Sequence, residues 1–223
     1  MGQRVAAVLF DVDGTLVESI DLRARAWADA LRRSGKDVRV EDVRAQIGKG
    51  GDQLLPVFLS EAELRERGNA IDRLRSELWK REYMPRVRPL PCARELVARV
   101  RREGKRVALA SGENADEVRF YERLLGVEGL VEGSVTSDDA GRSEPRPDVF
   151  GAALARARTD AEDAVAVGDS PWDALAARRA GVRTVGVLSG GFPEGDLRDA
   201  GCIAVYRDPA DLLARFDLSP LAA

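Results

Sequence analysis

Histidine is absent from the 223 residues, and cysteine occurs only twice, as Cys92 and Cys202. Without histidine the chain cannot form a Ser-His-Asp or Cys-His catalytic group, and it lacks a principal zinc ligand. The two cysteines lie far apart in the sequence without metal-ligand spacing, which favours reduced structural thiols over a disulfide framework. Any enzyme built from this sequence must work through carboxylates, hydroxyls, lysines or a cofactor.

Neither sign of charge dominates the sequence. Lys and Arg total 35 against 38 Asp and Glu, a net charge of -3, which lacks the positive excess that nucleic-acid binding requires. No apolar run approaches the roughly 20 residues of a membrane span, and the chain near Val5 shows no signal-peptide pattern. We therefore expect no nucleic-acid partner, no membrane insertion and a cytoplasmic location, with monomer and homodimer both open.

Short apolar runs alternate with helical patterns along most of the chain. This alternation predicts an α/β fold, a Rossmann-like parallel sheet with helices on both faces. The expected buried strands are 5–10, 106–110, 164–167, 183–188 and 203–206, and helical patterns cover 92–103, 148–158, 171–180 and a last helix from Asp208-Pro209.

Residues 18–86 break this alternation because helical patterns follow one another there, at 20–33, 41–46, 53–59 and 61–80. Pro85, Pro89 and Pro91 suit a stiff return to the core. We therefore predict a core of residues 1–17 and 87–223 that carries an inserted all-helical domain of residues 18–86.

Polar residues follow several of the predicted strands, where ligands gather in parallel sheets. Asp11 and Asp13 follow the first strand in Asp-Val-Asp-Gly-Thr. A carboxylate at a strand end can attack phosphorus, and a second one two residues on can carry the proton of the leaving group and of water. A simple turn or a calcium loop is the alternative interpretation of this run alone.

Two further strands end in candidate site residues. Ser111-Gly112 offers a hydroxyl and a backbone N–H to a phosphoryl oxygen, although Ser-Gly also forms ordinary turns. Asp169 follows the third strand and Asp173 comes four residues later. Mg²⁺ prefers a few carboxylate oxygens and several waters, so Asp169 together with Asp11 predicts a magnesium site. Asp173 also suits the first turn of a helix.

Together these motifs resemble the phosphatase branch of the haloacid dehalogenase superfamily, over nearly the whole chain. The resemblance implies that Asp11 is the nucleophile and a Mg²⁺ ligand, and that Asp13 is the general acid and base whose backbone carbonyl also meets the metal. It implies further that Ser111 and Gly112 bind the phosphoryl group, that Asp169 is a metal ligand, and that Asp173 supports the ligands from outside. Asp13 favours ester hydrolysis over dehalogenase or phosphonatase chemistry.

The third motif of that family departs from its pattern in this sequence. A lysine normally precedes Pro-x-Pro-Asp, and Glu144 stands in that position. The attraction between two opposite unit charges ~4 Å apart is about 4 kcal/mol at an effective dielectric of ~20. Losing this attraction in the transition state would slow the reaction roughly a thousandfold. Three possibilities stay open: Arg142, Arg146 or another cation substitutes for the lysine, the enzyme is slow, or catalysis is lost and the fold binds a phosphate ligand or has a regulatory role.

An inserted helical cap between the first two motifs resembles the branch of phosphoglycolate phosphatases and β-phosphoglucomutase. The branch implies a small phosphorylated metabolite as substrate and Lys49, in a glycine-rich loop, as a ligand of its distal anion. A solvated lysine in a helix-connecting turn is the alternative. Mutases of this branch use a histidine to keep water from the phosphoenzyme, so the lack of histidine favours hydrolysis over sugar-phosphate transfer.

Overall fold

The computed structural model describes residues 4–136 and 148–223. The chain divides into two compact units, one formed by Met1–Glu18 with Pro89–Ala223 and the other by Ser19–Arg88. The chain thus leaves the first unit and returns to it once. Among the described residues, no helix combines the length and the apolar character needed to cross a bilayer.

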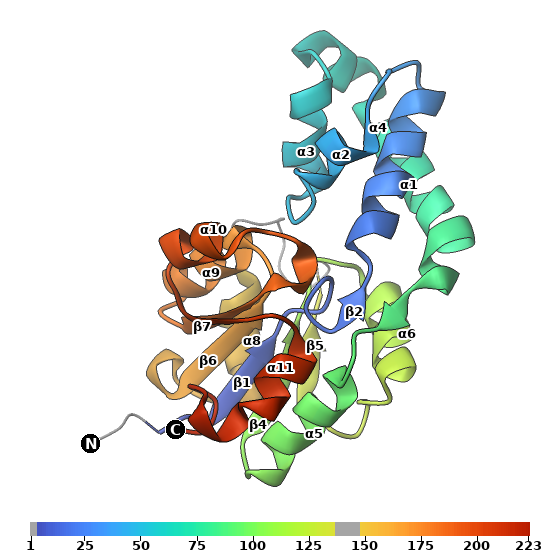
Figure 1. The fold of residues 1–223 in the computed structure, drawn as a ribbon. Helices are drawn as coiled ribbons and strands as arrows, with labels where there is room; N and C mark the ends of the chain where they lie inside the picture. The colour runs from blue at the N-terminus through green and yellow to red at the C-terminus, as the bar shows by residue number, and fades with distance from the viewer. Residues whose placement is uncertain (1–3, 137–147) are drawn as a thin grey trace. The chain divides into compact units, whose positions relative to one another are not determined.

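A six-stranded sheet in the order β5-β4-β1-β6-β7-β8 forms the centre of the first unit (Figure 1). Every pairing is parallel, which confirms the predicted fold class. Phe10 at the end of β1 pairs with Leu109 of β4 and Val167 of β6, so these three strands end side by side. The strands are β1 (Ala7–Phe10), β4 (Arg106–Ala110), β5 (Gly133–Val135), β6 (Ala164–Gly168), β7 (Arg183–Val187) and β8 (Cys202–Tyr206).

Helices cover both faces of this sheet. All four residues of β1 are fully buried, and successive side chains of a strand point to opposite faces. The helices of the unit are α5 (Ala93–Arg102), α6 (Ala115–Leu125), α8 (Asp148–Ala157), α9 (Pro171–Arg179), α10 (Glu194–Ala200) and α11 (Pro209–Ala214), with short 3-10 turns at Ala161–Asp163, Leu188–Gly190 and Phe216–Leu218.

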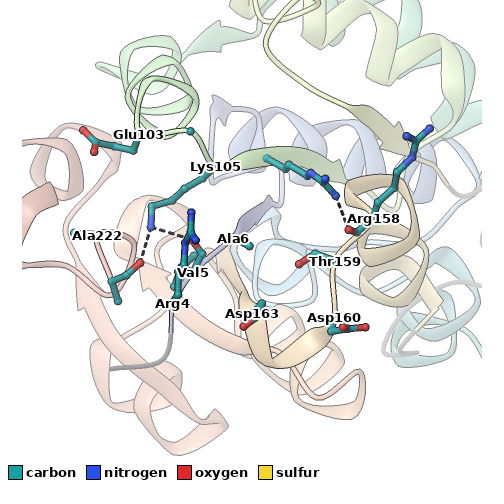
Figure 2. Close-up of a pocket in the computed structure, with 13 residues that line it drawn as sticks. Arg4, Val5, Ala6, Glu103, Lys105, Arg158, Thr159, Asp160, Asp163 and Ala222 are labelled. Carbon is teal, nitrogen blue, oxygen red and sulfur yellow. Dashed lines mark hydrogen bonds between the residues drawn. The ribbon is translucent and has the colours of Figure 1, made fainter. Parts of the chain in front are cut away.

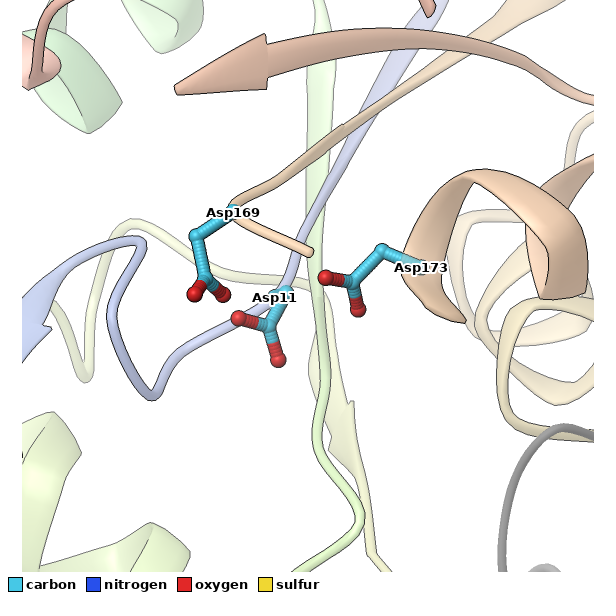
Figure 3. A group of neighbouring side chains, drawn as sticks. All are labelled: Asp11, Asp169 and Asp173. Carbon is cyan, nitrogen blue, oxygen red and sulfur yellow. The ribbon is translucent and has the colours of Figure 1, made fainter. Parts of the chain in front are cut away.

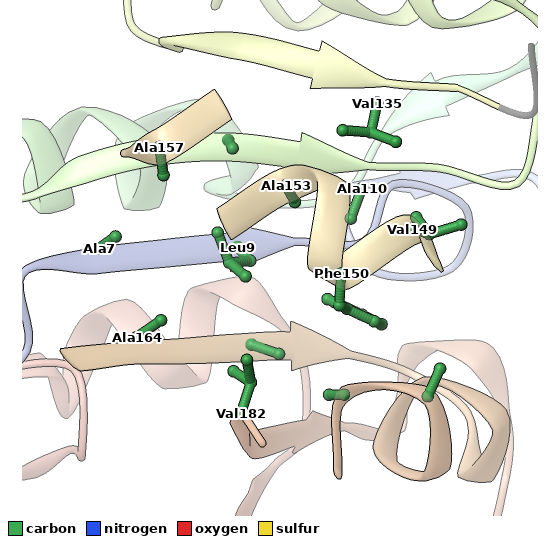
Figure 4. Packing of buried hydrophobic residues seen from close by; sticks show 14 residues of the cluster. Ala7, Leu9, Ala110, Val135, Val149, Phe150, Ala153, Ala157, Ala164 and Val182 are labelled. Atoms are coloured by element: carbon green, nitrogen blue, oxygen red, sulfur yellow. The ribbon is translucent and has the colours of Figure 1, made fainter. Parts of the chain in front are cut away.

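Small side chains dominate the core between the sheet and α8 and α9. Ala7 and Leu9 of β1 meet Phe150 and Ala153 of α8 there, and Val135 of β5 joins them (Figure 4). Alanines on both the strands and the helices let the two layers approach closely, while Phe150 supplies bulk. The apolar side chains removed from water here account for much of the stability of this unit.

The second unit contains helices only, apart from its end. Its elements are α1 (Ile20–Arg33), α2 (Val40–Arg44), α3 (Gly51–Phe58), α4 (Glu61–Leu78), a π-helical turn (Trp79–Tyr83) and a 3-10 turn (Met84–Arg86). In α1, Ala24, Trp27 and Leu31 are buried at helical spacing, and the helix packs against α2 and α4. The short strands β2 (Val17–Glu18) and β3 (Arg88–Pro89) pair where the chain passes between the units.

A pocket of about 700 Å³ opens at the amino-terminal end of the sheet, before the starts of β1, β4 and β6 (Figure 2). The Lys105 Nζ donates there to the carbonyl oxygens of Val5 at 3.0 Å and Ala223 at 2.6 Å. Burial lowers the pKa of this ammonium group. Because Lys105 ties the segment before β1 to the last residue of the chain, we interpret this end of the sheet as structural.

Candidate active site

The loop after β1 turns sharply, just beyond its first aspartate. The Asp11 N–H still donates to the Val167 carbonyl at 2.9 Å, so Asp11 continues the register of the sheet. Gly14 then adopts a φ of 77°, which glycine reaches without strain. The Leu16 and Val17 N–H groups return to the Val12 carbonyl at 2.8 and 3.1 Å. This closed loop holds Asp11 at the carboxyl end of the central strand.

The end of β6 and the start of α9 bring two more aspartates to the same place. Asp169 directly follows Gly168, the last residue of β6. Asp173 lies in the first turn of α9, where its Oδ2 accepts from the Ser170 N–H at 2.9 Å and from the Ser170 hydroxyl at 2.7 Å. This capping box fixes the Asp173 side chain while it satisfies the helix terminus.

Asp11, Asp169 and Asp173 form one carboxylate group (Figure 3). Each offers an oxygen that lies within 4.8 Å of the others. The Thr15 hydroxyl donates to the Asp169 Oδ1 at 3.3 Å. Asp11 Oδ2 is enclosed by the protein and has no hydrogen-bond partner among the described residues. A buried carboxylate oxygen without a donor is costly, and a bound cation at this place would satisfy it.

The electrostatics of this group favour a cation. Burial, followed by repulsion from Asp173 and Asp169, raises the pKa of Asp11 well above its ordinary value. Burial and the charge of Asp173 likewise raise the pKa of Asp169, and burial raises the pKa of Asp173 against the opposing Ser170 hydrogen bonds. Two like charges ~4 Å apart repel by about 4 kcal/mol at an effective dielectric of ~20. Carboxylate oxygens that repel one another in this way fit Mg²⁺ as the neutralising ion.

The Asp13 side chain lies beside this group and outside it. Its charge contributes to the raised pKa of both Asp11 and Asp169, which shows that it is near. The Tyr121 hydroxyl donates to Asp13 Oδ1 at 3.2 Å. The carboxylate group itself therefore consists of Asp11, Asp169 and Asp173, with the Asp13 carboxyl directed to another partner.

Ser111 and Gly112 follow β4, the neighbour of β1. The Ser111 N–H donates to the Val135 carbonyl at 3.1 Å, and its hydroxyl accepts from the Glu113 N–H at 3.2 Å. The Ser111 side chain is buried, and a Cβ added at Gly112 would meet no atom within 4 Å. Ser111 and Gly112 thus follow the carboxyl end of β4, beside the end of β1 that Asp11 follows.

Two predicted site residues are not among the described residues of the first unit. Lys49 belongs to the second unit, where its Nζ donates to Gln46 Oε1 at 2.6 Å in the loop before α3. Glu144 lies outside the described residues, as do Arg142 and Arg146.

The loop after β7 also builds this site, although none of its residues is among the predicted site residues. The Ser189 hydroxyl donates to the Gly14 carbonyl at 2.6 Å, which ties this loop to the loop of Asp11. A Cβ added at Gly190 would lie 1.6 Å from Asp169 Oδ2. A pair of glycines after a buried strand in an α/β pattern is the sequence signal that could have marked this close approach.

Known proteins are similar to this chain in sequence and in fold. The family model of the haloacid dehalogenase-like hydrolases matches residues 5–181. The phosphoglycolate phosphatase of Rhodospirillum rubrum is 29% identical over 220 residues, 92% of this chain and 88% of that protein. The phosphorylated carbohydrates phosphatase of Thermotoga maritima is 26% identical over 208 residues, 93% of this chain and 96% of that protein.

Among solved structures, a hydrolase from Pseudomonas syringae superposes with a TM-score of 0.86 at 29% identity, covering 96% of this chain and 98% of that one. The match to the family model covers the loop of Asp11, the ends of β4 and β6 and the inserted helical unit. The chain therefore belongs to the haloacid dehalogenase-like hydrolase family.

Proposed function

We propose that this protein is a Mg²⁺-dependent phosphatase that hydrolyses small phosphorylated metabolites through an aspartyl-phosphate on Asp11. The observation that carries the proposal is the carboxylate group of Asp11, Asp169 and Asp173, with an enclosed Asp11 oxygen that no donor satisfies among the described residues. Relatives named as phosphatases of phosphoglycolate and of phosphorylated carbohydrates support a small phosphate ester as the substrate.

In the first step, a carboxylate oxygen of Asp11 attacks phosphorus as the bond from phosphorus to the ester oxygen breaks. The ester oxygen keeps the electron pair of that bond and takes the proton of the Asp13 carboxyl, so the free alcohol leaves. The Ser111 hydroxyl and the Gly112 N–H, at the edge shared with Asp11, bind the phosphoryl oxygens. Lys49 is proposed to bind the anionic end of the substrate.

In the second step, the ionised Asp13 takes a proton from water as the water oxygen bonds to phosphorus. The bond between phosphorus and Asp11 breaks, inorganic phosphate leaves, and both aspartates return to their starting states. Asp11, Asp169 and the Asp13 carbonyl are proposed to hold Mg²⁺, with Asp173 supporting them. Bound Mg²⁺ neutralises the clustered carboxylates and the phosphate charge, so that an anionic nucleophile can approach an anionic ester.

A binding or regulatory role without turnover is the second candidate, and the observation that favours it is Glu144 in the position of the family lysine. A glutamate at this position would repel the phosphate and the other carboxylates, whereas the lysine of the family pattern would attract them. The proposed phosphatase is therefore expected to be slow unless another cation compensates.

Turnover of a panel of phosphorylated metabolites with and without Mg²⁺, together with beryllofluoride trapping, tests the proposal. We expect Mg²⁺-dependent phosphate release, a beryllofluoride adduct on Asp11, and loss of both in Asp11→Asn. Glu144→Lys is expected to raise kcat/KM, by up to about a thousandfold if no other cation acts. A wild-type protein that binds phosphate but neither turns over esters nor forms the adduct would establish the binding role instead.

A further inference from the structure

Tyr121 is a fully buried residue of α6 whose hydroxyl reaches the proposed active site. It donates to Asp13 Oδ1 at 3.2 Å, across 108 positions of sequence. The ring packs edge-on against Phe120, with centroids 5.7 Å apart. Tyr121 and Asp13 both belong to the first unit, so this hydrogen bond lies within one unit.

The helix that carries Tyr121 is held at both ends. Asn114 caps its start, where its Oδ1 accepts from the N–H groups of Asp116 at 3.1 Å and Glu117 at 3.2 Å. Gly126 ends it with a φ of 64°, the left-handed conformation of a common helix terminus. A hydroxyl on such a rigid element can hold a carboxyl group in one orientation, which a loop residue alone does less well.

We propose that Tyr121 is a positioning residue for Asp13, which it orients for proton transfer to the departing ester oxygen. Because Oδ1 accepts from Tyr121, the oxygen that carries the transferable proton is Oδ2. The same contact limits rotation of the Asp13 side chain, so that Oδ2 faces the ester oxygen throughout the step. This inference rests on the proposed phosphatase function.

The role predicts a dependence on the leaving group. An alkyl alkoxide is a poor leaving group and needs the proton of Asp13, whereas para-nitrophenolate leaves without full protonation. Tyr121→Phe keeps the ring and removes only the hydroxyl. We expect kcat/KM for glycerol phosphate to fall by about tenfold or more, and kcat/KM for para-nitrophenyl phosphate to fall by less than about threefold. The ratio kcat/KM is the readout because it reports the step in which the alcohol leaves.

Tyr206→Phe is the matched control, because it removes another hydroxyl of a buried tyrosine in the same unit, on β8 at the far edge of the sheet. Tyr206→Phe should leave the ratio of the kcat/KM values for the two substrates unchanged. Equal losses on both esters, or no loss in Tyr121→Phe, would overturn the positioning role while wild-type turnover upheld the phosphatase. A wild-type protein inactive on every ester would overturn the phosphatase and this role with it.

Discussion

The lack of a side chain at two glycines allows the acidic residues of the site to lie close together. Gly168 and Gly190 both stand where a side chain would strike an aspartate. A Cβ at Gly168 would lie 2.5 Å from the Asp173 Cβ, and one at Gly190 would lie 1.6 Å from Asp169 Oδ2. Both distances are far below van der Waals contact, and both backbones belong to buried strands or turns that cannot retreat.

Gly190→Ala tests this arrangement at the scale of one atom. The added methyl group must displace the Asp169 carboxylate, so we expect the apparent affinity for Mg²⁺ to weaken by about ten- to a hundredfold. Calorimetric Mg²⁺ titration of the folded variant measures this directly. Gly195→Ala is the control, because a Cβ there meets no atom within 4 Å and it should bind Mg²⁺ as the wild type does. Unchanged affinity in Gly190→Ala would contradict a role of Asp169 as a ligand.

Helix termini show how an element can serve both stability and the site. In α9 the capping box joins Ser170 and Asp173, so the side chain that satisfies the helix also lies in the carboxylate group. In α4 an equivalent box joins Ser60 and Glu63. There Glu63 also accepts from Lys36 Nζ at 2.8 Å and pairs with Arg67.

These contacts make the stability of the helical unit depend on pH. Hydrogen bonds from Lys36 and then from Ser60 lower the pKa of Glu63 from 4.5 to about 2. A lowered pKa means that the ionised form stabilises the fold above pH 4.5, and that this stabilisation is lost as pH falls through about 2. We expect Glu63→Gln to lower the thermal midpoint at neutral pH and to approach the wild type as the solution is acidified.

Thermal unfolding followed by circular dichroism across this pH range measures the effect. Glu61→Gln serves as the control, since the Glu61 side chain is 91% exposed and its ion pair with Arg65 is long, at 3.5 Å. A difference between Glu63→Gln and the wild type that stays constant from neutral to acidic pH would show that the charge of Glu63 plays no part.

At the scale of the molecule, β1 is the element on which the first unit depends. It pairs with β4 on one side and β6 on the other, and all its residues are buried. Leu9 contributes its side chain to the core shared with α8 and α9, and Asp11 follows the strand directly. A fully buried strand thus precedes the proposed nucleophile directly, which gives the reacting group a rigid support.

Leu9→Ala should therefore destabilise the protein strongly. Removing a buried leucine side chain costs about 2–5 kcal/mol of unfolding free energy, depending on how far the cavity collapses. Urea unfolding compared with the wild type measures this change. Leu218→Ala, which truncates a side chain that is 90% exposed, should change the midpoint little. Similar midpoints for the two variants would contradict the central place of β1 in the core.

The local patterns predicted most elements of the sheet correctly. All five expected strands are present, with ends shifted by at most two residues. β5 was missed because Gly133-Ser134-Val135 is too short and too polar to show a strand pattern. Helices α6 and α10 were not expected either, although Asn114 marks the start of α6 as a helix cap.

The sequence by itself determined the α/β fold, the family and the aspartates placed after the strands, because apolar periodicity and strand-end motifs are local properties of the chain. Only the tertiary structure decided that Asp173 joins Asp11 and Asp169, that Gly190 packs on Asp169, and that Tyr121 holds Asp13. Such contacts join segments many residues apart, and their distances depend on packing and register, which no local pattern encodes.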